Sequence, residues 1–254
     1  MSILAQAIVL AAGRGVRMGA LTDVTPKPLL QVRGKPLMQW HLEALAHGGL
    51  ARVVVNTAWL GAQIPAYFSN LFDLQPPTGK RLSLSISYSN EGVDFGHALE
   101  TAGGIARALP QLDEMFWAVA GDVFAPDFVF APSAMQHFAG SGQLAHLWLV
   151  PNPAHHLAGD FGLAADGLAL NAADTKFTFS GIALYRRALF APPWCLIPFG
   201  NPGGTVAPLA ALLRTAMDNG KVSASLYAGA WTDVGTPERL IQLNTHHASH
   251  HTAA

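Results

Sequence analysis

Short apolar runs separated by glycine-rich turns dominate the first part of the chain. Residues 7–10 and 53–55 are continuous apolar runs, which are typical of strands buried on both faces of a parallel sheet. Between them, apolar residues recur at helical spacing, which predicts a helix that opens at residues 34–36 and ends at Gly48. Strand, helix and strand in this order predict a βαβ unit with a right-handed crossover.

The same alternation continues to the end of the chain. Further strands are expected at residues 82–88, 116–120, 144–150, 177–185 and 223–227, and further helices at residues 101–109, 206–217 and 236–246. Alternating elements at this spacing predict an α/β fold, namely a single domain with a mostly parallel Rossmann-like sheet and helices on both faces. We place this domain at residues 1–246 and expect residues 247–254, which include several histidines, to form a flexible tail.

Composition and charge narrow the class of protein. Half of the 254 residues are apolar and 12% are charged, which is ample material for one sizeable core. The formal net charge of −1 gives no electrostatic case for a nucleic-acid or membrane partner, and the apolar run near the N-terminus is shorter than the about 20 residues of a membrane span. Cys195 has no second cysteine with which to form a disulfide, which favours a cytoplasmic protein.

A glycine loop with two arginines follows the first strand. Glycine at positions 13, 15 and 19 lets the backbone approach a phosphate closely, and Arg14 and Arg17 add positive charge. The loop does not match the dinucleotide-binding fingerprint, because Met18 stands where the third glycine is required. A Walker loop is excluded at Gly34-Lys35, because Pro36 follows instead of serine or threonine.

Three charged residues downstream extend this phosphate hypothesis. Lys27 lies between two prolines, so it sits on a stiff segment and loses little entropy when it meets an anion. Asp122 follows an apolar strand, where ligands bind in open α/β sheets, and Asp233 comes just before the last helix. Magnesium takes one or two carboxylates and completes its shell with substrate phosphates and water, so the two aspartates suit a magnesium site.

Together these motifs resemble the signature of the sugar-phosphate nucleotidyltransferases. The resemblance spans about residues 5–244, and its motifs lie in order at residues 10–17, 26–29, 121–122 and 231–237. Within the family, residues 56–61, 99–104, 152–161 and 179–182 are similar to those of uridylyltransferases that act on N-acetylmuramic acid 1-phosphate in bacterial cell-wall recycling. In two positions the chain departs from the family: Gly19 and Ala20 replace an arginine and a proline.

The resemblance implies a role for each motif. The nucleotide-binding backbone would comprise Leu10, Ala11, Ala12, Gly13 and Gly15, together with a loop at Gly103 and Gly104. The implied catalytic residues, in contact with phosphates, are Arg17 and Lys27, and the implied Mg²⁺ ligands are Asp122 and Asp233. The sugar-side candidates are Glu100, Asn152 and Asp160, although residues 93–97 lengthen the loop before Glu100.

The implied reaction transfers a nucleoside monophosphate from a nucleoside triphosphate to a sugar 1-phosphate and releases pyrophosphate. UTP and N-acetylmuramic acid 1-phosphate are the expected pair. Mannose 1-phosphate with GTP, and glucose 1-phosphate with UTP or dTTP, are alternatives. An alternative of another class is an inactive, nucleotide-binding regulatory subunit.

Overall fold

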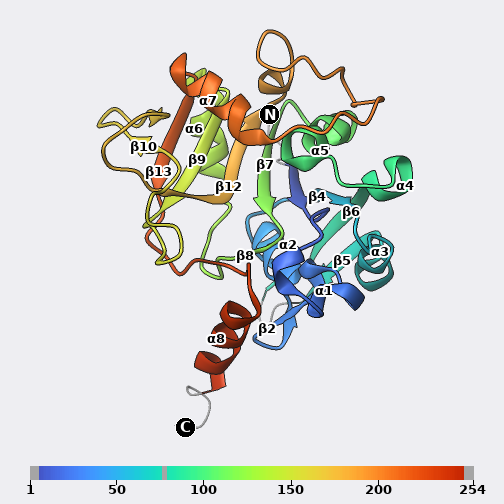
Figure 1. The fold of residues 1–254 in the computed structure, drawn as a ribbon. Coiled ribbons are helices and arrows are strands. Elements are labelled where there is room, and N and C mark those ends of the chain that lie inside the picture. The colour runs from blue at the N-terminus through green and yellow to red at the C-terminus, as the bar shows by residue number, and fades with distance from the viewer. Residues whose placement is uncertain (1–5, 76–78, 249–254) are drawn as a thin grey trace.

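The structure, a computed structural model, describes residues 6–75 and 79–248, and within them an eight-stranded sheet forms the centre of the molecule (Figure 1). The strands lie side by side in the order β13 (Val222–Leu226), β9 (Ala145–Val150), β12 (Thr178–Arg186), β7 (Met115–Ala120), β1 (Gln6–Leu10), β4 (Arg52–Thr57), β6 (Leu82–Asn90) and β5 (Leu71–Leu74).

The mostly parallel sheet is confirmed. The pairs β7–β1, β1–β4, β4–β6 and β13–β9 are parallel. Strand β12 runs antiparallel to both of its neighbours, and β5 runs antiparallel to β6. The carboxyl ends of β1, β4, β6 and β7 therefore lie at one edge of the sheet.

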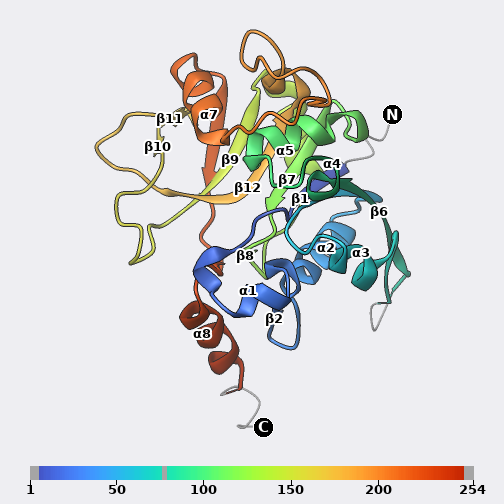
Figure 2. The same ribbon diagram turned by 45° about the vertical axis from the view of Figure 1, so that its right-hand side comes forward.

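Helices cover both faces of the sheet, as expected. Helices α5 (Glu100–Ala108) and α7 (Leu209–Asp218) lie side by side over one face (Figures 1 and 2). Helices α2 (Leu37–His47), α3 (Gln63–Phe68) and α6 (Pro132–Ser141) pack on the opposite face. Strand β1 shows the alternation: Ile8 packs beneath α5 and α7, whereas Ala7 and Val9 pack beneath the other helices. Burial on both faces explains the continuous apolar runs within β1, β4 and β7.

A third, smaller core lies at the lower end of the molecule in Figure 1, where the C-terminal helix α8 (Pro237–Ala248) extends from the body. Leu240 of α8 packs there with Met18 of the glycine loop and with Phe124. Asn244 accepts a hydrogen bond from the Arg33 amide at 2.7 Å and donates one to the Gln31 carbonyl at 3.1 Å. The helix is thus attached to the short hairpin of β2 (Gln31–Val32) and β3 (Lys35–Pro36).

Several boundaries differ from the sequence-based expectation. Helix α2 begins at Leu37 rather than at residues 34–36, because Lys35 and Pro36 form strand β3. Helix α7 begins at Leu209 rather than at residue 206, because Pro208 is extended at its N-cap. The expected loop at residues 93–97 largely forms helix α4 (Glu91–Phe95).

Some elements were not predicted, namely α3, α6, β5, the short helix α1 (Leu21–Val24) and the hairpin of β10 (Gly162–Leu163) and β11 (Ala169–Leu170). Helix α8 continues to Ala248, and the rest of the expected tail lies outside the described residues. None of the helices within residues 6–75 and 79–248 is both long and apolar enough to cross a membrane.

Candidate active site

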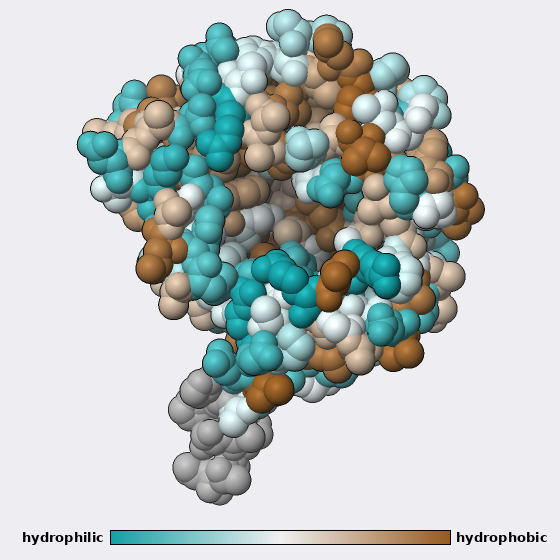
Figure 3. Space-filling model, viewed as in Figure 1, coloured by the Kyte–Doolittle hydropathy of each residue, from teal (hydrophilic) through white to brown (hydrophobic). Residues whose placement is uncertain are grey.

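A cavity of about 410 Å³ opens at the carboxyl ends of β1 and β7. Figure 3 shows this face hollowed near its middle, with hydrophilic surface along the lower rim of the hollow. The lining combines a backbone wall, two cations and two carboxylates, and comprises Leu10, Ala11, Ala12, Gly13, Gly15, Val16, Arg17, Lys27, Pro28, Asn56, Ala98, Glu100, Thr101, Ala120, Gly121, Asp122 and Gly235. Most of the residues expected at a nucleotide site therefore line one cavity.

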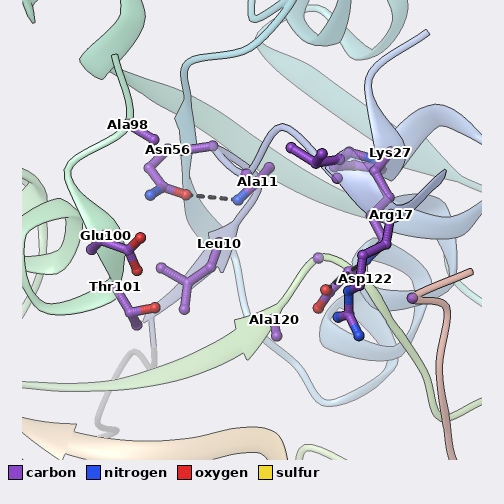
Figure 4. Close-up of a pocket in the computed structure, with 17 residues that line it drawn as sticks. Leu10, Ala11, Arg17, Lys27, Asn56, Ala98, Glu100, Thr101, Ala120 and Asp122 are labelled. Carbon is purple, nitrogen blue, oxygen red and sulfur yellow. Dashed lines mark hydrogen bonds and ion pairs between the residues drawn. The ribbon is translucent and has the colours of Figure 1, made fainter. Parts of the chain in front are cut away.

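The backbone wall is formed where β1 and β7 end side by side. The Gly121 amide donates a hydrogen bond to the Leu10 carbonyl at 2.8 Å. A Cβ atom at position 121 would lie 2.7 Å from that oxygen, so the approach requires glycine. On the other side of β1, Asn56 Oδ1 accepts a hydrogen bond from the Ala11 amide at 2.7 Å (Figure 4). The start of the glycine loop is thus fixed from both neighbouring strands.

The glycine loop itself depends on left-handed backbone conformations. Gly15 has φ of 66° and Gly19 has φ of 56° with ψ of −137°. Residues with a side chain rarely adopt the Gly19 conformation, so glycine suits this position. The Thr22 hydroxyl braces the turn by donating to the carbonyls of Gly15 and Gly19 at 3.1 and 3.2 Å.

The two arginines of the loop have separate environments. The Arg14 guanidinium lies 4.3 Å from the ring centroid of Trp59, whose indole N–H donates to the Thr22 carbonyl at 2.7 Å. Arg17 lines the cavity, and its side chain extends toward Asp122 in Figure 4. Of the two, Arg17 is therefore the one placed to meet a ligand in the cavity.

Lys27 is almost completely buried, with 6% of its surface exposed, and its ammonium contacts Asp122 Oδ2 at 2.8 Å. The side chain lies in the short 3-10 helix Lys27–Leu29, which Pro26 precedes with extended backbone angles. Asp122 is more open, with 44% of its side chain exposed. A buried ammonium beside an accessible carboxylate gives the cavity a preorganised charged centre.

Asp122 and Asp233 are brought together by a two-stranded ribbon of β8 (Val123–Phe124) and β14 (Thr232–Asp233). Asp233 pairs with Val123, and the Val234 amide donates to the Asp122 carbonyl at 2.8 Å. The Asp233 carboxylate also contacts Arg239, and His155 Nε2 lies 2.9 Å from Asp233 Oδ1. The two aspartates, 111 positions apart in the sequence, are thus neighbours in space.

His41 supports this ribbon from below and was not predicted. Its Nε2–H donates to the Val123 carbonyl at 2.8 Å, and 2% of its surface is exposed. Burial lowers the pKa of His41 from 6.5 to about 4, against smaller opposing effects of the Val123 hydrogen bond and of Asp122. The imidazole is therefore neutral near pH 7. A histidine on the buried face of the predicted helix was the available signal.

Asn152 and Asp160, two sugar-side candidates, lie outside the cavity lining. Asn152 donates to the carbonyls of Leu157 and Lys176 and accepts from the Thr178 hydroxyl at 2.9 Å. Asp160 accepts from the Phe179 amide at 2.8 Å. Both side chains thus organise the loop before β12, whereas the third candidate, Glu100, does line the cavity.

Gly103 and Gly104 lie inside helix α5 rather than in a loop, and neither is among the lining residues. A Cβ atom on Gly103 would lie 2.4 Å from the Thr205 carbonyl oxygen, and one on Gly104 would lie 2.5 Å from Glu91 Oε1. Their small size therefore permits close packing of α5 against neighbouring segments.

The donor set of the cavity suits a magnesium ion held jointly with phosphates. Among the described residues, no group of three or more histidine, cysteine, aspartate or glutamate side chains is placed to hold a metal ion by itself. The carboxylates of Asp122, which lines the cavity, and of Asp233, which lies on the paired strand β14 outside the lining, are hard oxygen ligands of the kind that magnesium prefers, and magnesium usually takes only one or two carboxylates.

The sequence also has clear relatives. A MobA-like NTP transferase domain matches residues 7–146. The chain is 42% identical to N-acetylmuramate alpha-1-phosphate uridylyltransferase from Neisseria meningitidis serogroup B, over 92% of this chain and 95% of that protein. It is 30% identical to the protein of the same name from Caulobacter vibrioides, over 91% of this chain and 92% of that protein.

A solved structure of HddC from Yersinia pseudotuberculosis with GMP-PN has a TM-score of 0.68 and 16% identity, and the match covers 95% of this chain and 99% of that one. At this identity the likeness supports the fold. The family assignment comes from the sequence matches. The domain match covers more than half of the chain, and the match to each relative covers more than nine tenths of it. The chain has a MobA-like NTP transferase domain and belongs to the sugar-phosphate nucleotidyltransferases.

Proposed function

We propose that the protein transfers UMP from UTP to N-acetylmuramic acid 1-phosphate and releases pyrophosphate. Two relatives that bear this activity in their names align with more than nine tenths of the chain. The observation that carries the proposal is the charged centre of the cavity, where the Lys27 ammonium meets Asp122 beside the backbone wall of β1.

The chemistry is an in-line displacement at the α-phosphorus of UTP. A phosphate oxygen of the sugar 1-phosphate forms a new bond to that phosphorus, and the bond from the α-phosphorus to the bridging oxygen breaks. The electron pair leaves with pyrophosphate. The attacking phosphate is already ionised at neutral pH, so the reaction needs no general base and no covalent enzyme intermediate.

The task of the protein is then to bring two anions together. Arg17 and Lys27 offset the repulsion between the two substrate anions, and the backbone at the end of β1 orients the nucleotide. Because Lys27 is buried and braced by Asp122, its charge requires little reorganisation during the reaction.

A magnesium ion would be held by Asp122 and Asp233, and when bound it would supply further neutralisation of phosphate charge. Each carboxylate also has a cationic neighbour, since Lys27 contacts Asp122 and Arg239 contacts Asp233. These contacts hold both carboxylates in place. We place the reaction in the cytoplasm, in keeping with the unpaired thiol of Cys195.

Pyrophosphate release in the presence of Mg²⁺ tests the proposal. The purified protein is supplied with UTP, GTP or dTTP, and with the 1-phosphates of N-acetylmuramic acid, N-acetylglucosamine, glucose or mannose. We expect release with UTP and the muramic substrate to exceed every other combination. A different preferred pair would replace the substrates and keep the reaction. Absence of release with every pair, in a folded protein that binds nucleotide, would instead indicate a regulatory subunit.

A further inference from the structure

Two buried polar side chains beside the cavity, Asn56 and Glu91, form a pair to which the reaction gives no role. Asn56 is 3% exposed and Glu91 is completely buried, and Asn56 Nδ2 donates to Glu91 Oε1 at 2.6 Å. A buried carboxylate is costly unless its oxygens accept strong hydrogen bonds, so its presence next to a ligand cavity calls for an explanation.

We propose that Asn56 and Glu91 are positioning residues that fix the two walls of the nucleoside part of the cavity relative to each other. This inference rests on the proposed function, because it assumes that the cavity binds a nucleoside triphosphate. Neither side chain is assigned contact with the reacting phosphates. Their effect is transmitted through the backbone segments that they hold.

One wall is the start of the glycine loop, and the other is the start of helix α5. Asn56 Oδ1 accepts from the Ala11 amide at 2.7 Å. Glu91 Oε2 accepts from the Leu99 amide at 2.7 Å, and Leu99 immediately precedes Glu100 in the cavity lining. A continuous chain of hydrogen bonds therefore runs from Ala11 through Asn56 and Glu91 to Leu99. In Figure 4, Ala11 and Glu100 lie on different segments that border the cavity, with Asn56 near Ala11.

The pattern of donors and acceptors along this chain allows one arrangement. Both partners of Glu91 present N–H groups, so Glu91 must offer two acceptor oxygens. A protonated Glu91 would direct an O–H toward one of these N–H groups. The geometry thus selects the carboxylate, even though burial raises the pKa of Glu91. In turn, the Glu91 acceptor orients the Asn56 amide, with its Nδ2 toward Glu91 and its Oδ1 toward Ala11.

Gly104 provides the space that the pair needs. A Cβ atom at position 104 would lie 2.5 Å from Glu91 Oε1 and 2.8 Å from Asn56 Nδ2. Those distances are shorter than any ordinary contact with a methyl group. Gly104 therefore contributes to the nucleotide site indirectly, by leaving room for the Asn56–Glu91 hydrogen bond.

Exchange of the two functional groups provides a sharp test. In Glu91→Gln, an amide N–H of the new glutamine must face a donor, either Asn56 Nδ2 or the Leu99 amide. In Asn56→Asp, two carboxylates face each other. In the double variant Asn56→Asp/Glu91→Gln, the introduced aspartate accepts from the Ala11 amide and from the glutamine amide, and the glutamine carbonyl accepts from the Leu99 amide. The double variant restores every donor–acceptor match with the same number of heavy atoms.

We expect each single variant to raise KM for UTP by on the order of tenfold, because two facing donors in Glu91→Gln, or two facing carboxylates in Asn56→Asp, cost enough to displace a wall of the site. KM for the sugar 1-phosphate should change little, and the double variant should recover at least half of the loss in KM on a logarithmic scale. The matched control is Asp94→Asn, which removes the negative charge from the exposed Asp94–Arg107 ion pair at 2.8 Å between α4 and α5 and should leave both KM values unchanged.

Steady-state KM values are paired with direct titration of UTP in the presence of Mg²⁺ and with thermal unfolding of each variant. Single variants that lose thermal stability without a selective change in UTP affinity would overturn the proposal, as would a double variant no better than the worse single. Wild-type protein that binds no nucleoside triphosphate would overturn the proposed function itself. If the wild type prefers another nucleotide, that nucleotide replaces UTP in the assays, and the comparison of the single and double variants tests the proposal in the same way.

Discussion

Replacement of Lys27 by methionine separates the effect of a buried charge on stability from its effect on catalysis. Methionine keeps most of the aliphatic stem, which borders Gly15 in the glycine loop, and removes the ammonium. Asp122 loses its contact at 2.8 Å but, with 44% of its side chain exposed, it can be solvated instead. We therefore expect the free energy of unfolding to change by no more than about 1 kcal/mol, because the buried ammonium also carries a desolvation cost that the variant escapes.

The effect on catalysis should be far larger. Among the described residues that line the cavity, Arg17 and Lys27 carry positive charge, so the variant removes half of that charge from the protein side. An ammonium about 4 Å from a phosphate charge contributes about 4 kcal/mol at an effective dielectric constant of about 20. Loss of one such preorganised donor typically lowers the rate by about 100-fold to 1000-fold. We expect kcat/KM for pyrophosphate release to fall within that range.

The matched control is Lys35→Met. Lys35 is also a partly buried lysine in an ion pair, with Glu43, but it is not among the cavity-lining residues. This control should keep wild-type kcat/KM. Pyrophosphate release and calorimetric unfolding are measured for both variants. If Lys27→Met retains kcat/KM within about threefold of wild type, or if it unfolds before activity can be measured at about 25 °C, the reasoning from a preorganised charge is wrong.

Three further variants test other parts of the site. Asp122→Asn should abolish Mg²⁺-dependent turnover while the circular dichroism spectrum and melting temperature stay near those of wild type, and substantial residual turnover would remove Asp122 from the magnesium site. Gly121→Ala should lower the free energy of unfolding, measured by chemical denaturation, by about 1–3 kcal/mol, because the new Cβ would lie 2.7 Å from the Leu10 carbonyl oxygen. For His41, the folded pKa of about 4 lies below the unfolded value of 6.5, so its contribution to stability is lost as the pH falls from about 6.5 to 4, by about 3 kcal/mol in total. His41→Gln should flatten that part of the stability–pH curve, and an unchanged slope would contradict the assignment.

Local patterns in the sequence predicted most of the central sheet because burial on two faces leaves a simple signature. Strands β1 and β7 are apolar at nearly every position, and β4 contains three consecutive valines. Strand direction leaves no such signature, and the antiparallel insertion of β12 between β7 and β9 therefore emerges only from the structure. The short elements α3 and β5 were not predicted because they are too short to show a clear periodic pattern of apolar residues.

For the site, the sequence indicated single residues but not the contacts between them. Strand-end reasoning located Asp122, and proline chemistry drew attention to Lys27, but their contact across 95 positions could not be seen in the sequence. The Asn56–Glu91 pair escaped prediction because each residue alone resembles an ordinary strand end or helix start. Gly104 was expected in a nucleotide-binding loop, but in the structure it leaves space for a hydrogen bond between two other side chains.

The small third core has a consequence for cooperativity. It joins Met18 of the glycine loop, Phe124 of the β8–β14 ribbon and Leu240 of α8 into one cluster apart from the two large cores. Such a cluster can open as a separate unit of local unfolding, or foldon, while the main sheet stays intact. A ligand that bridges the loop and the ribbon stabilises the closed form of that unit by mass action. Amide hydrogen exchange in α8 should therefore slow when nucleotide binds, so the C-terminal helix becomes a reporter of occupancy.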